Sequence, residues 1–199
     1  MPVSKKCANS GHILISGTGR AGTTLLVKYF AALGFDVGFS EDEIKHTSGG
    51  LEHFSDAEAP LPYVIKSPHY TETVGARLDR STLTIKYCIV PVRQIFDAAE
   101  SRRRVHRQGG GPGTIWLTDD PKKQETVLAL QFYKLIEALV RHNIPTYFLY
   151  FPGFAESSDA LYRGLKPVLD DHGVSQEQSD FAHREVVDLN LIHRFSVIP

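Results

Sequence analysis

The sequence predicts a three-layer α/β fold, in which helices cover both faces of a central parallel sheet of about five strands. Short apolar runs alternate along the chain with stretches whose apolar residues recur at helical spacing. The runs are apolar at consecutive positions, which is typical of strands buried on both faces. A glycine-rich turn, 17–22, joins the first run to the first helical stretch. Because ligands of such sheets bind beyond the carboxyl ends of the strands, the residues at those ends are the candidates for function.

The predicted strands are short and follow one another in regular alternation with helices. They cover residues 12–16, 35–39, 63–66, 84–90 and 146–150. The predicted helices cover residues 22–33, 70–79, 94–106, 122–142 and 155–173. Residues after 174 are weakly patterned. The length of 199 residues suits a single domain that spans 1–199.

The turn after the first predicted strand has the spacing of a phosphate-binding loop that lacks its lysine. Such a loop reads glycine, four residues, glycine, lysine, and serine or threonine. Gly17 and Gly22 keep this frame, but Thr23 stands at the lysine position and Thr24 follows. The glycines allow a tight turn, so that backbone N–H groups and a helix N-terminus converge on an anion. Arg20 is the nearest cation. The alternative is a turn that binds nothing, and the flanking strand and helix favour the anion site.

Lys66 ends the predicted strand 63–66, directly before the chain turns at Pro68. At this position a lysine can direct its ammonium towards an anion in the first turn, although a solvated lysine at a strand edge is the simpler alternative. His69 is a candidate general base because an unperturbed imidazole titrates near neutral pH. A histidine in a surface turn explains His69 equally well, so both interpretations stay open.

Arg93 follows the predicted strand 84–90, and Ser101 comes eight residues later on the next predicted helix. Arginine offers a planar fork suited to phosphate, and a serine hydroxyl adds one donor. This pair therefore predicts a second anion site. The basic run 102–107 would add positive potential nearby, although such a run is usually a solvated helix face.

The composition excludes several classes of function. The net charge of −1 gives no support to a protein that coats nucleic acid. No apolar run approaches the roughly 18 residues of a membrane span, and the N-terminus lacks the apolar core of a signal peptide. The two cysteines, Cys7 and Cys88, do not suggest a disulfide framework, so we expect a cytoplasmic location. No spacing of Cys and His predicts a metal site.

Two predicted loops stand out by length and composition. The first, 47–62, contains paired glycines, prolines and acidic residues, and the second, 107–121, contains a glycine-rich stretch and the only tryptophan, Trp116. Long loops at the ligand end of a sheet often act as lids or binding loops. For 47–62 a simple surface loop is an equally good interpretation, whereas Trp116 favours a functional role for 107–121.

Taken together, these motifs resemble those of sulfotransferases that use 3′-phosphoadenosine 5′-phosphosulfate (PAPS). In that family a loop that carries lysine or arginine and ends in Gly-Thr-Thr holds the 5′-phosphosulfate, and an arginine and a serine eight positions apart hold the 3′-phosphate. The segment 18–25 looks most like the tyrosylprotein and bacterial members, and Arg93 with Ser101 is similar to the second motif. The segment 66–70, Lys-Ser-Pro-His-Tyr, resembles a strand-end motif of heparan sulfotransferases. The resemblance covers about the first half of the chain.

The resemblance implies a P-loop NTPase-like fold and transfer of a sulfuryl group from PAPS to a hydroxyl or amine, with no metal required. Arg93 and Ser101 would hold the 3′-phosphate. The late Arg-Lys-Gly segment of the cytosolic members is absent, so we expect the loop 107–121 to cover the adenosine instead, with Trp116 as a candidate stacking residue. Lys66 would stabilise charge on the bridging oxygen. The residues implied for the 5′-phosphosulfate are Gly19, Arg20, Ala21, Gly22, Thr23, Thr24 and Leu25.

The catalytic base stays open at this stage, because the chain departs from each branch of the family. Heparan-type members place a glutamate just before the lysine, where this chain has Ile65. Cytosolic members place a histidine two residues after it, whereas His69 comes three residues after, and their late Arg-Lys-Gly segment is absent. Tyrosylprotein members carry a glutamate shortly after the first helix, where Glu41 and Glu43 fall. The candidates for the base are therefore Glu41, Glu43 and His69.

Two alternatives belong to other classes of function. A P-loop kinase or NTPase needs a lysine on the β- and γ-phosphates and an acid at a strand end for magnesium, and the predicted strand ends carry neither aspartate nor glutamate. A non-catalytic nucleotide-binding protein would keep the fold without a base. The short chain leaves little sequence for a large cleft, so we expect a small-molecule acceptor.

Overall fold

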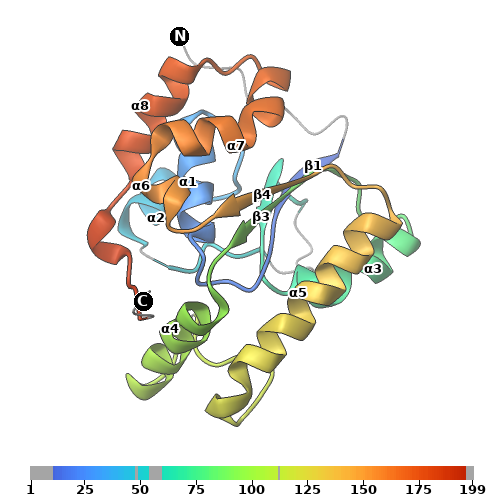
Figure 1. Ribbon diagram of the computed structural model, residues 1–199. Coiled ribbons are helices and arrows are strands. Elements are labelled where there is room, and N and C mark those ends of the chain that lie inside the picture. Colours follow the sequence, from blue (N-terminus) through green and yellow to red (C-terminus); the bar gives the residue numbers. More distant parts are fainter. Residues whose placement is uncertain (1–10, 48, 54–59, 112, 196–199) are drawn as a thin grey trace.

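A computed structural model describes residues 11–47, 49–53, 60–111 and 113–195, so Cys7 and parts of both long loops lie outside the described residues. Its centre is an all-parallel sheet in the order β2-β1-β3-β4 (Figure 1). The strands are β1 (His12–Ile15), β2 (Val64–Lys66), β3 (Ile85–Val92) and β4 (Thr146–Tyr150). Ile15 at the end of β1 pairs with Lys66 of β2 and with Ile89 of β3. The carboxyl ends of these three strands therefore meet at one edge of the sheet.

Among the described residues the sheet has four strands, and the expectation of about five was wrong at 35–39. Phe35 and Val37 are buried in the core, so their apolar character is real. The backbone between and after them turns instead of extending, because Gly38 has a φ of 70° and donates its N–H to Asp36 Oδ1 at 3.1 Å. The apolar run 35–39 therefore indicates burial in the core, and not a strand that pairs with the sheet.

Helices lie on both faces of the sheet (Figure 1). One face carries α1, α6, α7 and α8, and the other carries α3 and α5, while α4 packs on α5. The bounds are α1 (Thr23–Ala32), α2 (Glu41–His46), α3 (Tyr70–Asp79), α4 (Ile95–Arg107), α5 (Gln124–Arg141), α6 (Gly153–Glu156), α7 (Ser158–Asp171) and α8 (Gln176–Val186), with 3₁₀ turns at Pro121–Lys123 and Leu189–Leu191. Among the described helices, none combines the length and apolar character that crossing a membrane requires.

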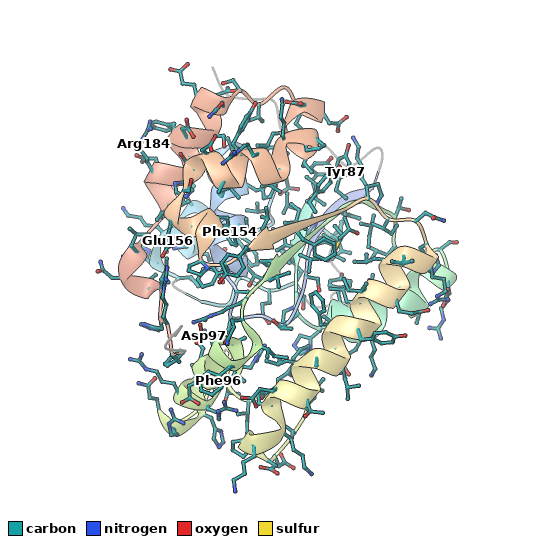
Figure 2. The ribbon with its side chains drawn as sticks, viewed as in Figure 1. Tyr87, Phe96, Asp97, Phe154, Glu156 and Arg184 are labelled. Carbon is teal, nitrogen blue, oxygen red and sulfur yellow. The ribbon has the colours of Figure 1, made fainter. Side chains whose placement is uncertain are left out.

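The apolar core consists of layers on the two sides of the sheet. Ile13 and Ile15 of β1 belong to the layer under α1 and α7, whereas Leu14 between them belongs to the layer under α3 and α5. This alternation follows from the geometry of a strand, whose successive side chains point to opposite faces. Phe154 of α6 is buried, whereas Phe96 at the start of α4 stays largely exposed (Figure 2).

Among the described helices, α2 and α8 were not predicted from the sequence, and the single helix expected over 155–173 is divided at Ser157 into α6 and α7. Helices α2 and α8 each begin with a capping box, in which the Ser40 or Ser175 side chain accepts from the backbone three residues later, while Glu43 or Gln178 reaches back. The pattern Ser-x-x-Glu/Gln is a recognised start signal for a helix. This pattern could therefore have predicted the start of both helices.

Candidate functional site

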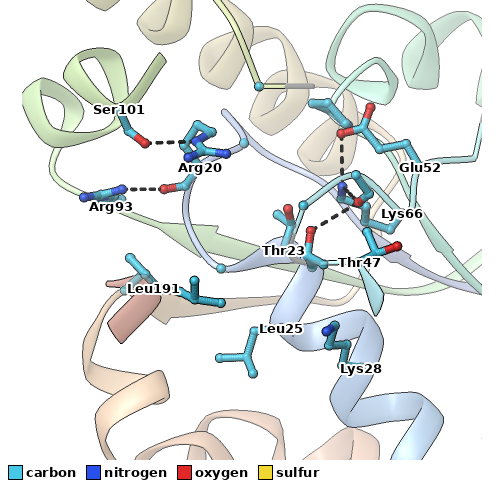
Figure 3. A pocket seen from close by; sticks show the side chains of 18 of the residues that line it. Arg20, Thr23, Leu25, Lys28, Thr47, Glu52, Lys66, Arg93, Ser101 and Leu191 are labelled. Atoms are coloured by element: carbon cyan, nitrogen blue, oxygen red, sulfur yellow. Dashed lines mark hydrogen bonds and ion pairs between the residues drawn. The ribbon is translucent and has the colours of Figure 1, made fainter. Parts of the chain in front are cut away.

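A cavity of about 620 Å³ opens at the carboxyl ends of β1, β2 and β3 (Figure 3). Its walls come from the turn after β1 and the start of α1, the end of α2 with residues 47, 49, 50 and 52, the ends of β2 and β3, the buried side of α4, and the segments 113–116 and 186–193. Cavities of about 300–1,000 Å³ are usual for small-molecule ligands. The sequence motifs thus lie around one concavity of a suitable size.

Backbone conformation and close packing explain the glycines of the turn 17–22. Gly22, the N-cap of α1, has a φ of 80°, in the left-handed region that favours glycine. A Cβ at Gly22 would lie 2.7 Å from the Phe151 ring and 2.8 Å from the Phe154 ring. The start of α1 therefore approaches the aromatic layer too closely for any other residue.

The turn presents backbone donors that no described residue accepts. Between residues 18 and 25, no N–H group donates to an atom of the described chain, and the first helical bond runs from Leu26 N to the Gly22 carbonyl at 3.1 Å. The first N–H groups of a helix lack intrahelical partners and carry partial positive charge. A row of amide donors at a helix N-terminus is a ready binding site for an anion.

Arg20, Arg93 and Ser101 are in direct contact although they come from three separate segments (Figure 3). Arg20 donates from Nε to Ser101 Oγ at 2.9 Å, and Arg93 donates from Nη1 to the Arg20 carbonyl at 2.8 Å. Burial lowers the pKa of both guanidinium groups from the ordinary value of an arginine. The cation of the first turn and the arginine–serine pair therefore belong to one site.

The segment after α8 returns to this site and covers Arg93. Arg93 donates from Nη2 to the His193 carbonyl, and the N–H of Phe195 donates to Asp97 Oδ1 at 2.9 Å. Asp97 lies on the first turn of α4 (Figure 2). The Arg93 guanidinium also lies over the Phe151 ring, 5.3 Å from its centroid.

Lys66 is buried at the end of β2 and directs its ammonium into the cavity (Figure 3). Nζ donates to the Gly50 carbonyl at 2.6 Å and to Glu52 Oε1 at 3.0 Å. Thr24 Oγ1 donates to the same carbonyl at 3.1 Å, so Lys66 and the start of α1 meet at Gly50. Burial lowers the pKa of Lys66, and the neighbouring Glu52 opposes that shift.

His53 fixes the backbone of Lys66. Its N–H donates to the Lys66 carbonyl at 2.7 Å, and its Nδ1 accepts from the Lys66 N–H at 3.0 Å. Nδ1 is therefore the unprotonated nitrogen, and Nε2 donates to the Val37 carbonyl at 3.1 Å. Burial lowers the pKa of His53 below 6.5, which favours this neutral tautomer.

The candidates for the base occupy different places. His69 lines the cavity, and its ring meets the edge of Trp116 at 5.8 Å between centroids. Glu41 and Glu43 do not line it. Glu41 is exposed on the first turn of α2, and Glu43 caps that helix by accepting from the Ser40 N–H at 2.8 Å. Of the three, the structure brings only His69 to the other predicted residues.

The remaining predicted residues of the turn also differ in whether they line the cavity. Gly19, Thr23, Thr24 and Leu25 line the cavity, whereas Ala21 is fully buried behind it. Trp116 contributes to the wall through the segment 113–116.

Sequence reasoning missed several charged residues of the cavity, among them Glu52 and Arg102. Glu52 lies in an irregular segment and gave no signal. Arg102 belongs to the basic run 102–107, which was expected to add positive potential near the site and for which a solvated helix face was the usual interpretation, yet only 4% of Arg102 is exposed. It follows the buried Ala98 by four positions on α4, a spacing that puts both on one helix face. That spacing was the available signal.

Arg102 is held between two loops. Its guanidinium donates to the Thr18 carbonyl at 2.7 Å and to the Thr114 carbonyl at 2.8 Å, and it lies 5.2 Å from the centroid of the Trp116 ring. Burial and the neighbouring Arg20 lower the pKa of Arg102 to about 10, so it remains protonated at neutral pH.

No protein-family model matches this chain, and no curated protein matches it in sequence. The described residues contain no group of three or more His, Cys, Asp and Glu side chains arranged to bind a metal ion.

Proposed function

We propose that the protein transfers a sulfuryl group from PAPS to a hydroxyl or amine of a small acceptor. The contact between Arg20 and the pair Arg93–Ser101 carries this proposal, because it joins two predicted anion sites in one cavity. A nucleotide with a single phosphate chain would use only the amides of the turn and Arg20. A nucleotide with a second phosphate on its ribose would also use Arg93 and Ser101.

The cavity supplies the groups that sulfuryl transfer needs. The acceptor oxygen or nitrogen attacks sulfur, the bond from sulfur to the bridging oxygen breaks, and 3′-phosphoadenosine 5′-phosphate leaves with the electron pair. Negative charge then develops on the bridging oxygen. Lys66, Arg20 and the amides of the turn are fixed donors for that charge, and donors fixed in advance stabilise a transition state without reorganisation.

The acceptor must lose one proton in the same reaction, and two residues of the cavity are suited to take it. Glu52 is a carboxylate held beside Lys66 by a 3.0 Å ion pair, so it lies next to the site of bond breaking. His69 lines the cavity beside Trp116. We favour Glu52 because its partner Lys66 is the cation assigned to the leaving oxygen.

Substitution separates these two candidates. Glu52→Gln should lower kcat by about 10²-fold or more, as expected for loss of a general base, while leaving the affinity for PAPS within a few-fold. His69→Gln should retain most of the rate. The reverse pattern would assign the base to His69, and unchanged rates in both variants would exclude both residues.

Calorimetric titration with 3′-phosphoadenosine 5′-phosphate (PAP), beside ATP with magnesium, tests the nucleotide. We expect micromolar affinity for PAP and little for Mg·ATP. Binding of Mg·ATP alone would contradict the proposal and favour a kinase or NTPase. Tight binding of PAPS without transfer to any hydroxyl or amine acceptor would instead favour a nucleotide-binding protein.

A further inference from the structure

Arg102 is a buried cation whose hydrogen bonds go to backbone carbonyls. None of the ion pairs among the described residues includes it, and its Nε has no hydrogen-bond partner there. Burying a charge outside any ion pair is costly, so the hydrogen bonds and the ring contact of the guanidinium must offset that cost. The contacts of Arg102 are the carbonyls of Thr18 and Thr114 and the face of Trp116.

The bond to Thr18 determines the direction of an amide in the anion-binding turn. The only cis peptide bond of the described chain is Phe151–Pro152, so the Thr18–Gly19 bond is trans. In a trans peptide the C=O and N–H groups point to opposite sides. Since Arg102 holds the Thr18 carbonyl on one side, the Gly19 N–H is directed to the other. Arg93 holds the Arg20 carbonyl in the same way and thereby directs the next amide, that of Ala21.

Two glycines make room for the arginines that join the loops. A Cβ at Gly19 would lie 2.6 Å from Arg102 Nη2, and a Cβ at Gly113 would lie 2.9 Å from Arg20 Nη1. Arg102 therefore passes close to the turn on one side and reaches the segment 113–116 on the other. The Arg102 guanidinium ties the wall that carries Trp116 to the anion-binding turn by hydrogen bonds, and the Arg20 side chain of the turn lies close to the same wall at Gly113.

We propose that Arg102 is a positioning residue, which orients the Gly19 amide for an anion and couples the Trp116 segment to occupation of the turn. The identity of that anion, the phosphosulfate of PAPS, rests on the function proposed above, but the positioning role needs only an anion in the turn. If Arg102 acted through electrostatics alone, any positive charge at this position would be sufficient.

Lysine distinguishes geometry from charge at this position. Arg102→Lys keeps the positive charge, but an ammonium on a flexible stem does not reproduce a planar fork that reaches two carbonyls and stacks on an aromatic face. Arg102→Gln removes the charge as well. Arg104→Gln is the matched control, because Arg104 is an exposed arginine two residues further along the same helix.

The experiment is calorimetric titration of the four proteins with inorganic pyrophosphate and with PAP, with thermal unfolding as the check of folding. We expect Arg102→Lys and Arg102→Gln to lose about tenfold or more in affinity for both ligands, the scale of a lost charge-assisted hydrogen bond. Arg104→Gln should stay within about twofold of the unsubstituted protein. Affinities of Arg102→Lys equal to those of the unsubstituted protein would overturn the proposal.

Fluorescence supplies a readout that a merely structural role would not change. Trp116 is the only tryptophan, so its emission reports the segment that Arg102 holds. Pyrophosphate should change this emission in the unsubstituted protein and in Arg104→Gln, but not in Arg102→Lys at saturating ligand. A response in Arg102→Lys equal to that of the unsubstituted protein would contradict the coupling.

A second variant tests the proposal if the Arg102 substitutions do not fold. Trp116→Leu removes the surface on which Arg102 packs and keeps the arginine. It should weaken binding of pyrophosphate, which has no adenine to stack, and unchanged affinity would overturn the positioning role. Binding of pyrophosphate but not PAP would refute only the proposed function, whereas binding of neither would refute both.

Discussion

Arg20 donates a hydrogen bond to Ser101 at 2.9 Å, although 81 positions separate the two residues. The sheet topology produces this contact. Arg20 follows β1 and Ser101 lies on the helix that follows β3, and the two strands are parallel neighbours. Segments that leave adjacent parallel strands emerge side by side, so two short motifs form one site without any direct connection.

The first prediction concerns the selectivity of Arg93. Arg93→Ala should weaken binding of PAP by about tenfold to a hundredfold, because a buried guanidinium contributes charge-assisted bonds to phosphate. It should weaken binding of adenosine 5′-phosphosulfate, which lacks the 3′-phosphate, far less. Calorimetry with both nucleotides measures the difference. Equal losses for the two would show that Arg93 does not hold the 3′-phosphate.

Lys66 gives a prediction about pH. The ammonium form binds the nucleotide, and burial lowers the pKa of Lys66 below 10.5. Affinity for PAP should therefore fall as pH rises through that pKa, at lower pH than an ordinary lysine would require. Lys66→Arg should remove this loss, because a guanidinium stays protonated over the whole range. Titrations with PAP between about pH 7 and pH 10 would measure it.

Glu52 is the control for the same titration. Its carboxylate raises the pKa of Lys66, so Glu52→Gln should move the alkaline loss of affinity to lower pH. If the loss stays where it is in Glu52→Gln, or persists in Lys66→Arg, the titrating group is not Lys66.

The sequence predicts correctly those helices and strands for which the apolar pattern and the local start signal indicate the same element. Four of the five predicted strands and the helices α1, α3, α4, α5 and α7 occur near their expected positions. The failure at 35–39 arose because an apolar run reports burial, whereas the ladder also needs a backbone free of turn geometry. The glycine at 38 and the Asp36 side chain impose that geometry.

The site was predictable where it is built from motifs and unpredictable where it depends on contacts distant in sequence. Arg20, Lys66 and Arg93 were proposed from their places at or just after strand ends, and Ser101 from its spacing of eight residues from Arg93, and all four line one cavity. Glu52 was not, because its role depends on a loop that brings it to Lys66. No local pattern encodes such a contact.

His53 yields a prediction about stability. Its folded-state pKa lies below 6.5 because burial disfavours the charged ring. Its contribution is therefore fully present above the unfolded value and is lost as pH falls through the folded pKa, where protonation breaks the bond from the Lys66 N–H. Urea unfolding at about pH 7.5 and pH 5 should show a larger loss of stability for the unsubstituted protein than for His53→Gln, which cannot titrate. Equal losses would exclude His53 as the source.

The last prediction concerns the packing of Gly22. Gly22→Ala combines a residue at φ 80° with a Cβ that would lie under 3 Å from the Phe151 and Phe154 rings. Gly173→Ala is the matched control, since Gly173 has φ 65° and no atom within 4 Å of the added Cβ. Gly173→Ala should lower the free energy of unfolding by about 1–2 kcal/mol, because alanine is strained in the left-handed region. Gly22→Ala should lower it by about 1–3 kcal/mol more, because the methyl group overpacks the aromatic layer.

Urea unfolding measures both variants. Gly22→Ala should also lose affinity for pyrophosphate. To make room for the methyl group, the start of α1 must move away from the two rings, and its backbone amides move with it. Gly173→Ala, at a residue that does not line the cavity, should bind as the unsubstituted protein does. Equal destabilisation of the two variants would mean that the aromatic layer accommodates the methyl group, and that the approach of α1 to Phe151 and Phe154 does not fix the position of the turn.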